Sequence, residues 1–198
     1  MSQLAVERIL GADITQVIDD LARLRIVVFR EYPYLYDGTL DYERRYLASY
    51  AQCPESVVVV ARDAGKVVGA STAMPLTAHG EGLVPTFAAA GIAPDSVYYF
   101  GESVLDAAYR GRGLGHAFFD HREATARDLG YAIAAFCAVV RPSDHPRRPA
   151  GYVPHDAFWS RRGYTKRPEL RASFSWRDVD ESRASPKAMV FWLKELAS

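Results

Sequence analysis

The chain has 198 residues, of which 49% are hydrophobic, and this is enough for one domain with a full core over residues 1–198. Lysine plus arginine equals aspartate plus glutamate at 24 each, so no global charge favours nucleic acid or a membrane surface. Cys53 and Cys137 fit neither a disulfide framework nor a zinc knuckle. The first residues lack a secretion signal, and no apolar run approaches the roughly 20 residues of a membrane span. We therefore expect a cytoplasmic protein.

The first half of the chain predicts two helices and a hairpin. A helix is expected to begin near Asp13 and Thr15, because apolar side chains then recur at steps of three and four residues. A turn-rich aromatic segment, residues 31–38, ends it, and a second helix follows with Tyr42, Tyr46, Leu47 and Tyr50 on one side. Two β-branched runs, residues 56–61 and 66–71, then predict a β-hairpin.

The second half alternates strands and helices. Residues 77–94 are interrupted by Gly and Pro and allow at most a short helix near residues 87–90. The expected elements that follow are a strand over 97–105, a helix over 112–129, a strand over 131–140, a short helix over 156–162, and strands near 173–177 and 188–193. The predicted order, β, α, α, β, β, β, α, β, α, β, β, is typical of a mixed α/β single domain.

A Gly-rich turn between the strand over 97–105 and the next helix carries the clearest chemical signal. Backbone N–H groups at a helix N-terminus lack partners, and glycine lets a phosphate approach them closely. A dinucleotide fingerprint fails here because the sixth position from Gly111 is His116, and no Gly-Lys-Ser/Thr follows for a Walker loop. The turn therefore predicts a phosphate or pyrophosphate site of another kind.

The remaining pattern, Arg110-x-x-Gly113-x-Gly115, resembles the pyrophosphate loop of the GNAT N-acetyltransferase superfamily. The segment Phe158-Trp159 on a short helix, followed by Gly163-Tyr164, resembles the second signature of that superfamily. The resemblance implies a single-domain GNAT fold with a mixed central sheet of about six to seven strands flanked by helices. It also implies that the strands 97–105 and 131–140 splay apart and bind acetyl-CoA between them.

The resemblance also assigns the acetyl-CoA contacts residue by residue. Backbone N–H groups of the loop would bind the pyrophosphate, and the main chain of Val104 and Leu105 would pair with the pantetheine. The predicted cofactor-binding residues are Val104, Leu105, Arg110, Gly111, Arg112, Gly113, Leu114, Gly115 and His116.

The catalytic residues follow the family less closely. In many members a Tyr in the second signature acts as the acid, but Trp159 stands in that place, and an indole N–H donates a hydrogen bond without being a usable acid. Glu102 is the one carboxylate between Val97 and Leu105 and is the predicted base for the amine, although a Glu here could instead pair with an Arg. Asp144, His145 and His155 remain further candidates for the proton transfer.

The aromatic segment between the first two helices is the predicted acceptor site, because those helices border the acceptor pocket in the superfamily. Tyr32, Tyr34 and Tyr36 could hold a cationic or apolar amine, or could simply pack the domain edge. A basic group in a later loop could favour an acidic acceptor or the 3′-phosphate of CoA. Its members are Arg141, Arg147 and Arg148.

Two functions stay open at this point. One is an acetyl-CoA-dependent N-acetyltransferase that moves the acetyl group to a primary amine of a small-molecule acceptor by direct attack. The other is a non-catalytic acyl-CoA-binding sensor or interaction module, and Trp159 is its main support. The histidines match no metal motif, so no metal is expected. A homodimer is possible through the closing strands and Trp192.

Overall fold

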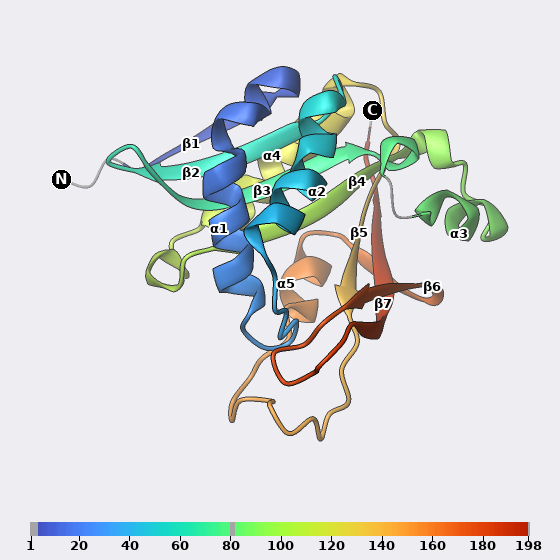
Figure 1. The fold of residues 1–198 in the computed structure, drawn as a ribbon. Helices are drawn as coiled ribbons and strands as arrows, with labels where there is room; N and C mark the ends of the chain where they lie inside the picture. Colours follow the sequence, from blue (N-terminus) through green and yellow to red (C-terminus); the bar gives the residue numbers. More distant parts are fainter. Residues whose placement is uncertain (1–3, 80–81, 198) are drawn as a thin grey trace.

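The computed structural model describes residues 4–79 and 82–197 and builds them around one mixed seven-stranded sheet (Figure 1). The strands lie in the order β1-β2-β3-β4-β5-β7-β6. They are β1 (Leu4–Leu10), β2 (Val57–Asp63), β3 (Lys66–Pro75), β4 (Val97–Leu105), β5 (Ile133–Val139), β6 (Thr165–Trp176) and β7 (Ser185–Glu195). The α-helices are α1 (Ile18–Phe29), α2 (Leu40–Gln52), α3 (Leu83–Ala89), α4 (Leu114–Asp128) and α5 (Asp156–Arg161).

This architecture confirms the predicted fold class and element order, and α3 overlaps the short helix allowed near residues 87–90. The strands β6 and β7 are longer than the pattern of residues indicated. The helix α4 buries the charged Arg122 and Glu123 beside its apolar side chains, whereas Leu129, just beyond its end, is 40% exposed. No helix of the described ranges is both long and apolar enough to cross a bilayer.

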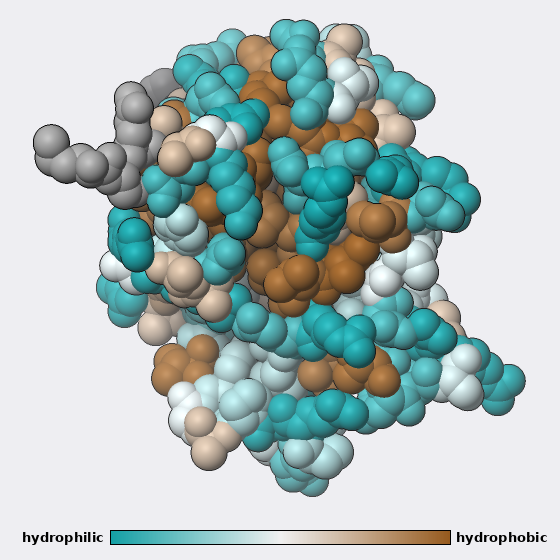
Figure 2. Space-filling model, turned by 60° about the vertical axis from the view of Figure 1, so that its left-hand side comes forward, coloured by the Kyte–Doolittle hydropathy of each residue, from teal (hydrophilic) through white to brown (hydrophobic). Residues whose placement is uncertain are grey.

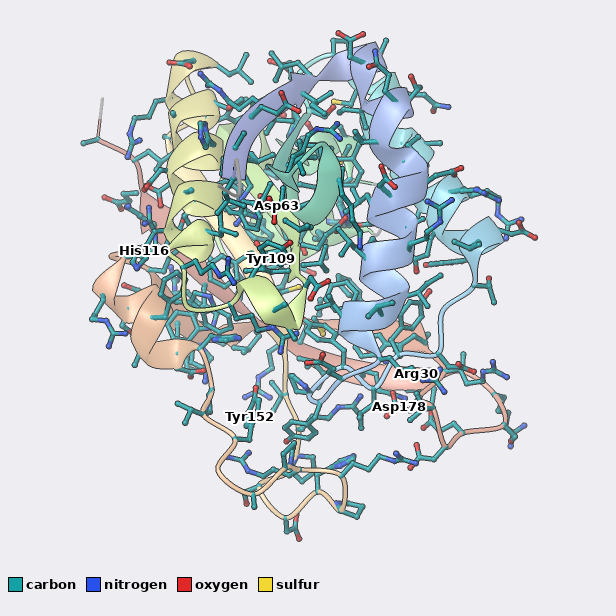
Figure 3. The ribbon with its side chains drawn as sticks, turned by 90° about the vertical axis from the view of Figure 1, so that its left-hand side faces the viewer. Arg30, Asp63, Tyr109, His116, Tyr152 and Asp178 are labelled. Carbon is teal, nitrogen blue, oxygen red and sulfur yellow. The ribbon has the colours of Figure 1, made fainter. Side chains whose placement is uncertain are left out.

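Helices cover both faces of the sheet, with α1 and α2 on one side and α4 on the other (Figures 1 and 3). The unbroken β-branched run of β2 follows from this, since a strand buried on both faces does not alternate with polar residues. Val58 and Val60 pack in the core beneath α1 and α2, whereas Val57 and Val59 pack with Phe118 of α4. The sheet is thus held rigidly between two helical layers.

The strands β4 and β5 pair over only three residues and then separate. Val97–Tyr99 pair in parallel with Ile133–Ala135, but β4 continues to Leu105 and β5 to Val139. Each strand keeps its other neighbour, β3 for β4 and β7 for β5, so the separation does not unravel the sheet (Figure 1). The facing backbone groups of the two strands are left to satisfy another partner. This confirms the predicted splayed strand pair.

A β-bulge distorts β4 where the strands part. Gly101 and Glu102 together oppose the single residue Thr72, and the Glu102 N–H donates to the Thr72 hydroxyl at 3.2 Å. A Cβ on Gly101 would lie 2.1 Å from the Tyr50 hydroxyl oxygen, so only glycine fits. Such bulges re-aim the neighbouring side chain, which here is Glu102.

Arg122 of α4 fixes this bulge from the other side of the sheet. Its guanidinium is buried and donates to the carbonyl oxygens of Thr72 at 3.3 Å and Glu102 at 3.2 Å. It also donates to the Ser103 hydroxyl at 2.9 Å. Burial lowers the pKa of Arg122 to about 10, so it stays protonated at neutral pH. A charged side chain on the core-facing side of α4 is therefore explained by the carbonyl groups that it satisfies.

The proposed role of Trp192 at a sheet edge is wrong. The strand β7 lies between β5 and β6, and Trp192 is 3% exposed, stacked parallel to Phe136 with ring centroids 6.4 Å apart. The edges of the sheet are β1 and β6. A homodimer stays a prediction, without Trp192 as a contact.

Candidate functional site

The Gly-rich turn before α4 presents a row of backbone N–H groups. Gly111 and Gly113 have φ of +76° and +82°, a left-handed conformation that favours glycine. Among the described residues, no backbone carbonyl accepts from the N–H groups of residues 111–115, whereas the His116 N–H donates to the Gly113 carbonyl at 2.9 Å. An anion at the N-terminus of α4 therefore has the donors of residues 111–115, and His116 is already engaged in the first turn.

The side chains of this turn bind the protein on either side of it. Arg110 forms a two-point ion pair with Glu31, at 2.9 and 3.1 Å, and so ties the turn to the end of α1. Arg112 lies over the Tyr109 ring at 5.0 Å. The His116 ring contacts Phe158 of α5 at 4.9 Å, and Figure 3 shows it in the first turn of α4. The side chains of the turn are thus engaged with the protein, and the backbone N–H groups are what the turn offers to an anion.

A cleft of about 920 Å³ opens between the separated ends of β4 and β5. This volume is within the usual range for cofactor sites. Its walls come from both strands and from the N-terminal parts of α4 and α5; they include Ser103, Leu105, Gly115, Ala138, Val139 and Trp159. Val104 and Leu114 of the predicted set instead bury their side chains in the core. The face of the molecule that Figure 2 shows has a hydrophobic area across its middle, and hydrophilic residues surround this area.

A second, smaller pocket of about 120 Å³ adjoins the cleft. It lies under α1 and α2, with Trp176 of β6 and Met189 of β7 on its other side. The two cavities share five wall residues, which are Phe29, Tyr34, Gly101, Glu102 and Cys137. The small pocket therefore meets the cleft at the bulge, where β4 and β5 part.

Glu102 sits at this junction in a buried charge cluster. Its side chain is 2% exposed, 2.7 Å from the Arg25 guanidinium, and accepts a hydrogen bond from the Tyr46 hydroxyl at 3.2 Å. Arg25 also binds Glu43, which is fully buried. Burial raises the pKa of Glu102, and the positive charge of Arg25 opposes that rise. Glu102 thus pairs with an Arg, as the alternative interpretation expected, and it also lines both cavities, while its role as a base stays a prediction.

Arg25 and Glu43 were not predicted, although the sequence carries a signal for them. Arg25 follows Leu21 by four residues, and Glu43 precedes Leu47 by four, so each lies on the apolar face of its helix. A charge on such a face needs a buried partner of opposite sign.

His79 is a further wall residue of the small pocket that carried no functional prediction. Its ring lies 4.6 Å from that of Tyr99, in an edge arrangement. Burial and the nearby Arg25 lower the pKa of His79 to about 4. This histidine is therefore neutral at physiological pH and adds no charge to the pocket.

The three predicted acceptor tyrosines divide between the two cavities. Tyr34 and Tyr36 line the small pocket, with Tyr34 also on the cleft. Tyr32 lines the cleft alone, 4.7 Å from Tyr152 and 5.7 Å from His145 between ring centroids. The segment from Tyr32 to Tyr36 therefore lines both cavities and not just one of them.

Trp159 has mainly packing contacts. Its ring lies 5.0 Å from Phe136 and 5.2 Å from Trp192, and it also lines the cleft.

The arginines of the basic loop are mostly paired within the protein. Arg141 is not available for an acidic acceptor, because its buried guanidinium binds Asp178 at 2.8 Å and the Tyr34 carbonyl at 2.7 Å. Arg147 and Arg148 lie on the cleft wall, the former paired with Asp180 at 2.9 Å.

In the described ranges, no three His, Cys, Asp or Glu side chains converge as metal ligands.

Comparisons with known proteins agree with this geometry. A family model described as the acetyltransferase (GNAT) family matches residues 21–149, from α1 through the loop after β5. Similar solved structures include a ribosomal-protein-alanine N-acetyltransferase from Brucella melitensis (12% identity, 97% of this chain and 99% of that chain, TM-score 0.62). An N-acetyltransferase from Staphylococcus aureus matches at 12% identity, with 98% of this chain, 99% of that chain and a TM-score of 0.60. These structural likenesses show a shared fold. No curated protein matches the sequence.

Proposed function

The chain belongs to the GNAT acetyltransferase family, and we propose that it moves an acetyl group from acetyl-CoA directly to the primary amine of a small-molecule acceptor. The observation that carries this proposal is the meeting of a large cleft and a small carboxylate-lined pocket at Glu102, where β4 and β5 part. Two ligands that enter from opposite sides would meet at that residue.

The cleft suits acetyl-CoA in three respects. The N–H groups of residues 111–115 and the dipole of α4 suit a pyrophosphate. The backbone edges of β4 and β5 beyond Tyr99 suit the amide groups of pantetheine. The cleft also has the volume for an extended cofactor. When bound, acetyl-CoA supplies a thioester, which is an activated acyl group.

Glu102 would act as the base that removes a proton from the acceptor ammonium. A base works best when its pKa lies near the working pH, and burial raises the pKa of Glu102 in that direction. The contacts with Arg25 and Tyr46 hold the carboxylate at the mouth of the pocket. Holding the amine and the acyl donor together supplies much of the remaining rate.

Trp159 does not exclude catalysis. Thiols are far more acidic than alcohols, as the pKa of about 8.5 of a cysteine side chain illustrates, so a thiolate can leave without first receiving a proton. Trp159 nevertheless keeps the non-catalytic acyl-CoA sensor as a second candidate, because the indole cannot supply an acid. The buried carboxylate beside an adjoining pocket favours the enzyme.

Acceptor-dependent release of CoA separates the two candidates. We expect the protein to release free thiol from acetyl-CoA with a mixture of primary amines and to form N-acetyl products visible by mass spectrometry. Glu102→Gln should lower kcat by about 10²- to 10⁴-fold and leave acetyl-CoA binding unchanged. The control variant is Glu7→Gln, which should keep its activity. Glu7 lies on β1, where its carboxylate forms an ion pair with Arg62 at 2.7 Å.

Two results would contradict the proposal. Binding of acetyl-CoA without thiol release across all classes of amine would favour the sensor. Unchanged turnover in Glu102→Gln would remove Glu102 from the role of base.

A further inference from the structure

The small pocket lies beside a buried charge cluster with an excess of negative charge, in which Glu102 lines the pocket and Glu43 is bound to the lining residue Arg25. Two buried carboxylates, Glu43 and Glu102, share one guanidinium, that of Arg25. Their side chains are 0% and 2% exposed, so water screens this imbalance little. With both carboxyls ionised, the cluster keeps one uncompensated negative charge.

One oxygen of each carboxylate also lacks a donor. Within the described residues, Oε1 of Glu43 and Oε1 of Glu102 have no hydrogen-bond partner. A buried acceptor without a donor destabilises the protein, and more so when it is charged. Glu102 lines the pocket while this oxygen is itself buried, so a donor on a ligand reaches it after a small shift of the side chain and then satisfies it.

The remaining wall favours a cation with an apolar body. It carries aromatic rings, among them Tyr36 and Tyr42, and the face of an aromatic ring attracts an ammonium group. The Trp176 ring already has Arg141 and Lys187 over it, at 5.9 and 5.8 Å. Arg25 is the sole lysine or arginine among the pocket residues of the described chain, and it is already bound by two carboxylates. Among the described residues, the pocket therefore offers no uncommitted positive charge to a carboxylate on the ligand.

The volume sets the size of the ligand. At about 120 Å³ the pocket is somewhat smaller than an apolar cavity of about 150 Å³, which takes benzene with its six carbon atoms. The part of the acceptor that enters it is thus limited to about five non-hydrogen atoms.

We propose that the acceptor is a small primary alkylamine that carries no carboxylate beside its amine, and that its ammonium group binds Oε1 of Glu102. This inference rests on the proposed function. An α-amino acid would place its carboxylate next to Glu102, close to a cluster whose net charge is already negative because of Glu43, and such like-charge contacts weaken binding.

The transfer balances with this ligand. The ammonium gives one proton to Glu102, and the nitrogen lone pair forms the new C–N bond while the C–S bond breaks. The electron pair of that bond leaves on sulfur, and the second proton lost by nitrogen converts the thiolate to a thiol. Glu102 returns its proton to water, so the products are an acetamide, CoA and one proton.

Paired probes test the charge rule on the full chain with acetyl-CoA. L-Norvaline is n-butylamine with a carboxylate added beside the amine, and L-norvalinamide keeps the added size without the negative charge. We expect kcat/KM for n-butylamine to exceed that for L-norvaline by at least about 100-fold, with L-norvalinamide between them. Equal or better turnover of L-norvaline would overturn the inference.

A wider amine panel keeps this inference distinct from the proposed function. If only bulky amines or α-amino acids are acetylated, the inference fails and the acetyltransferase stands. If acetyl-CoA binds and no amine in the panel is acetylated, both fail.

The variant Glu43→Gln tests the charge without touching the amine. It should raise KM for n-butylamine about tenfold and leave kcat little changed. The ratio of kcat/KM for n-butylamine to kcat/KM for L-norvaline should become smaller than in the wild type. An unchanged preference in a folded variant would contradict the role of the excess charge. Glu7→Gln is the matched surface control, and the wild-type comparison decides the matter if Glu43→Gln does not fold.

Discussion

Glu102 shows how a single residue acquires chemistry from its surroundings. Its place as the one carboxylate on β4 was enough to predict it as a candidate base. Its partners Arg25, Glu43 and Tyr46 come from α1 and α2, far away in the sequence, so the buried cluster could not be predicted from the strand itself. The local sequence thus singled out the residue, and tertiary packing supplies the buried surroundings on which its proposed role as a base depends.

The pH dependence of turnover follows from this environment. Glu102 accepts a proton only when ionised, and burial raises its pKa above the 4.5 of an ordinary glutamate. We therefore expect kcat/KM for n-butylamine to fall as pH decreases through a midpoint above 4.5. His79 faces the same pocket, but with a pKa of about 4 it is neutral throughout that range. Initial rates of thiol release between pH 5 and 9 measure the midpoint.

The Glu102→Gln variant is the control for this profile. The small residual kcat/KM of this variant should no longer fall at low pH, because glutamine does not titrate. A decrease that persists unchanged in the variant would assign the titration to another group.

At the scale of elements, local patterns predicted most helices and strands, and the side of α2 with Leu47 and Tyr50 is buried as expected, but they did not predict the charged side chains that α4 buries. The Gly-rich turn and α4 follow from short-range rules, since glycine allows the left-handed turn and the helix begins directly after it. The burial of Arg122 depends on carbonyl groups of β3 and β4. No apolar periodicity contains that information, because the partners lie on other elements.

The bulge in β4 gives a prediction about stability. Gly101→Ala should cost about 1–3 kcal/mol, because the new Cβ overlaps the Tyr50 hydroxyl. For a chain of this size, each kcal/mol lowers Tm by about 2–4 °C. Tyr50→Phe removes that hydroxyl and should cost less in the Gly101→Ala background than alone. Thermal unfolding of the double-mutant cycle measures this coupling.

Gly115→Ala provides the comparison. A Cβ there meets only Phe158 at an ordinary 3.7 Å, so its unfolding temperature should not fall. Equal unfolding temperatures for Gly101→Ala and wild type would contradict the described packing of the bulge.

At the scale of the whole molecule, the cleft exists because β4 and β5 stop pairing after Tyr99 and Ala135 while each of them stays paired with its other neighbour. The two strands are held apart by β3 on one side and β7 on the other. Arg141 donates to the Tyr34 carbonyl and forms an ion pair with Asp178. It thereby ties the segment from Tyr32 to Tyr36, which lines both cavities, to the residues that follow β6. The splayed pair was predicted through resemblance to a known family, since no single segment of the sequence shows where the pairing of two strands stops.

The most direct test of the account is a calorimetric titration of the protein with acetyl-CoA, alongside Gly113→Trp and Gly91→Trp. Both glycines have positive φ, +82° and +74°, and neither Cβ would meet an atom within 4 Å, so the two substitutions strain the backbone alike. Gly113 lies in the turn before α4, and Gly91 lies beyond the end of α3. The account predicts micromolar binding to wild type and Gly91→Trp, and none to Gly113→Trp. No binding to wild type at millimolar acetyl-CoA, or full binding to Gly113→Trp, would contradict it.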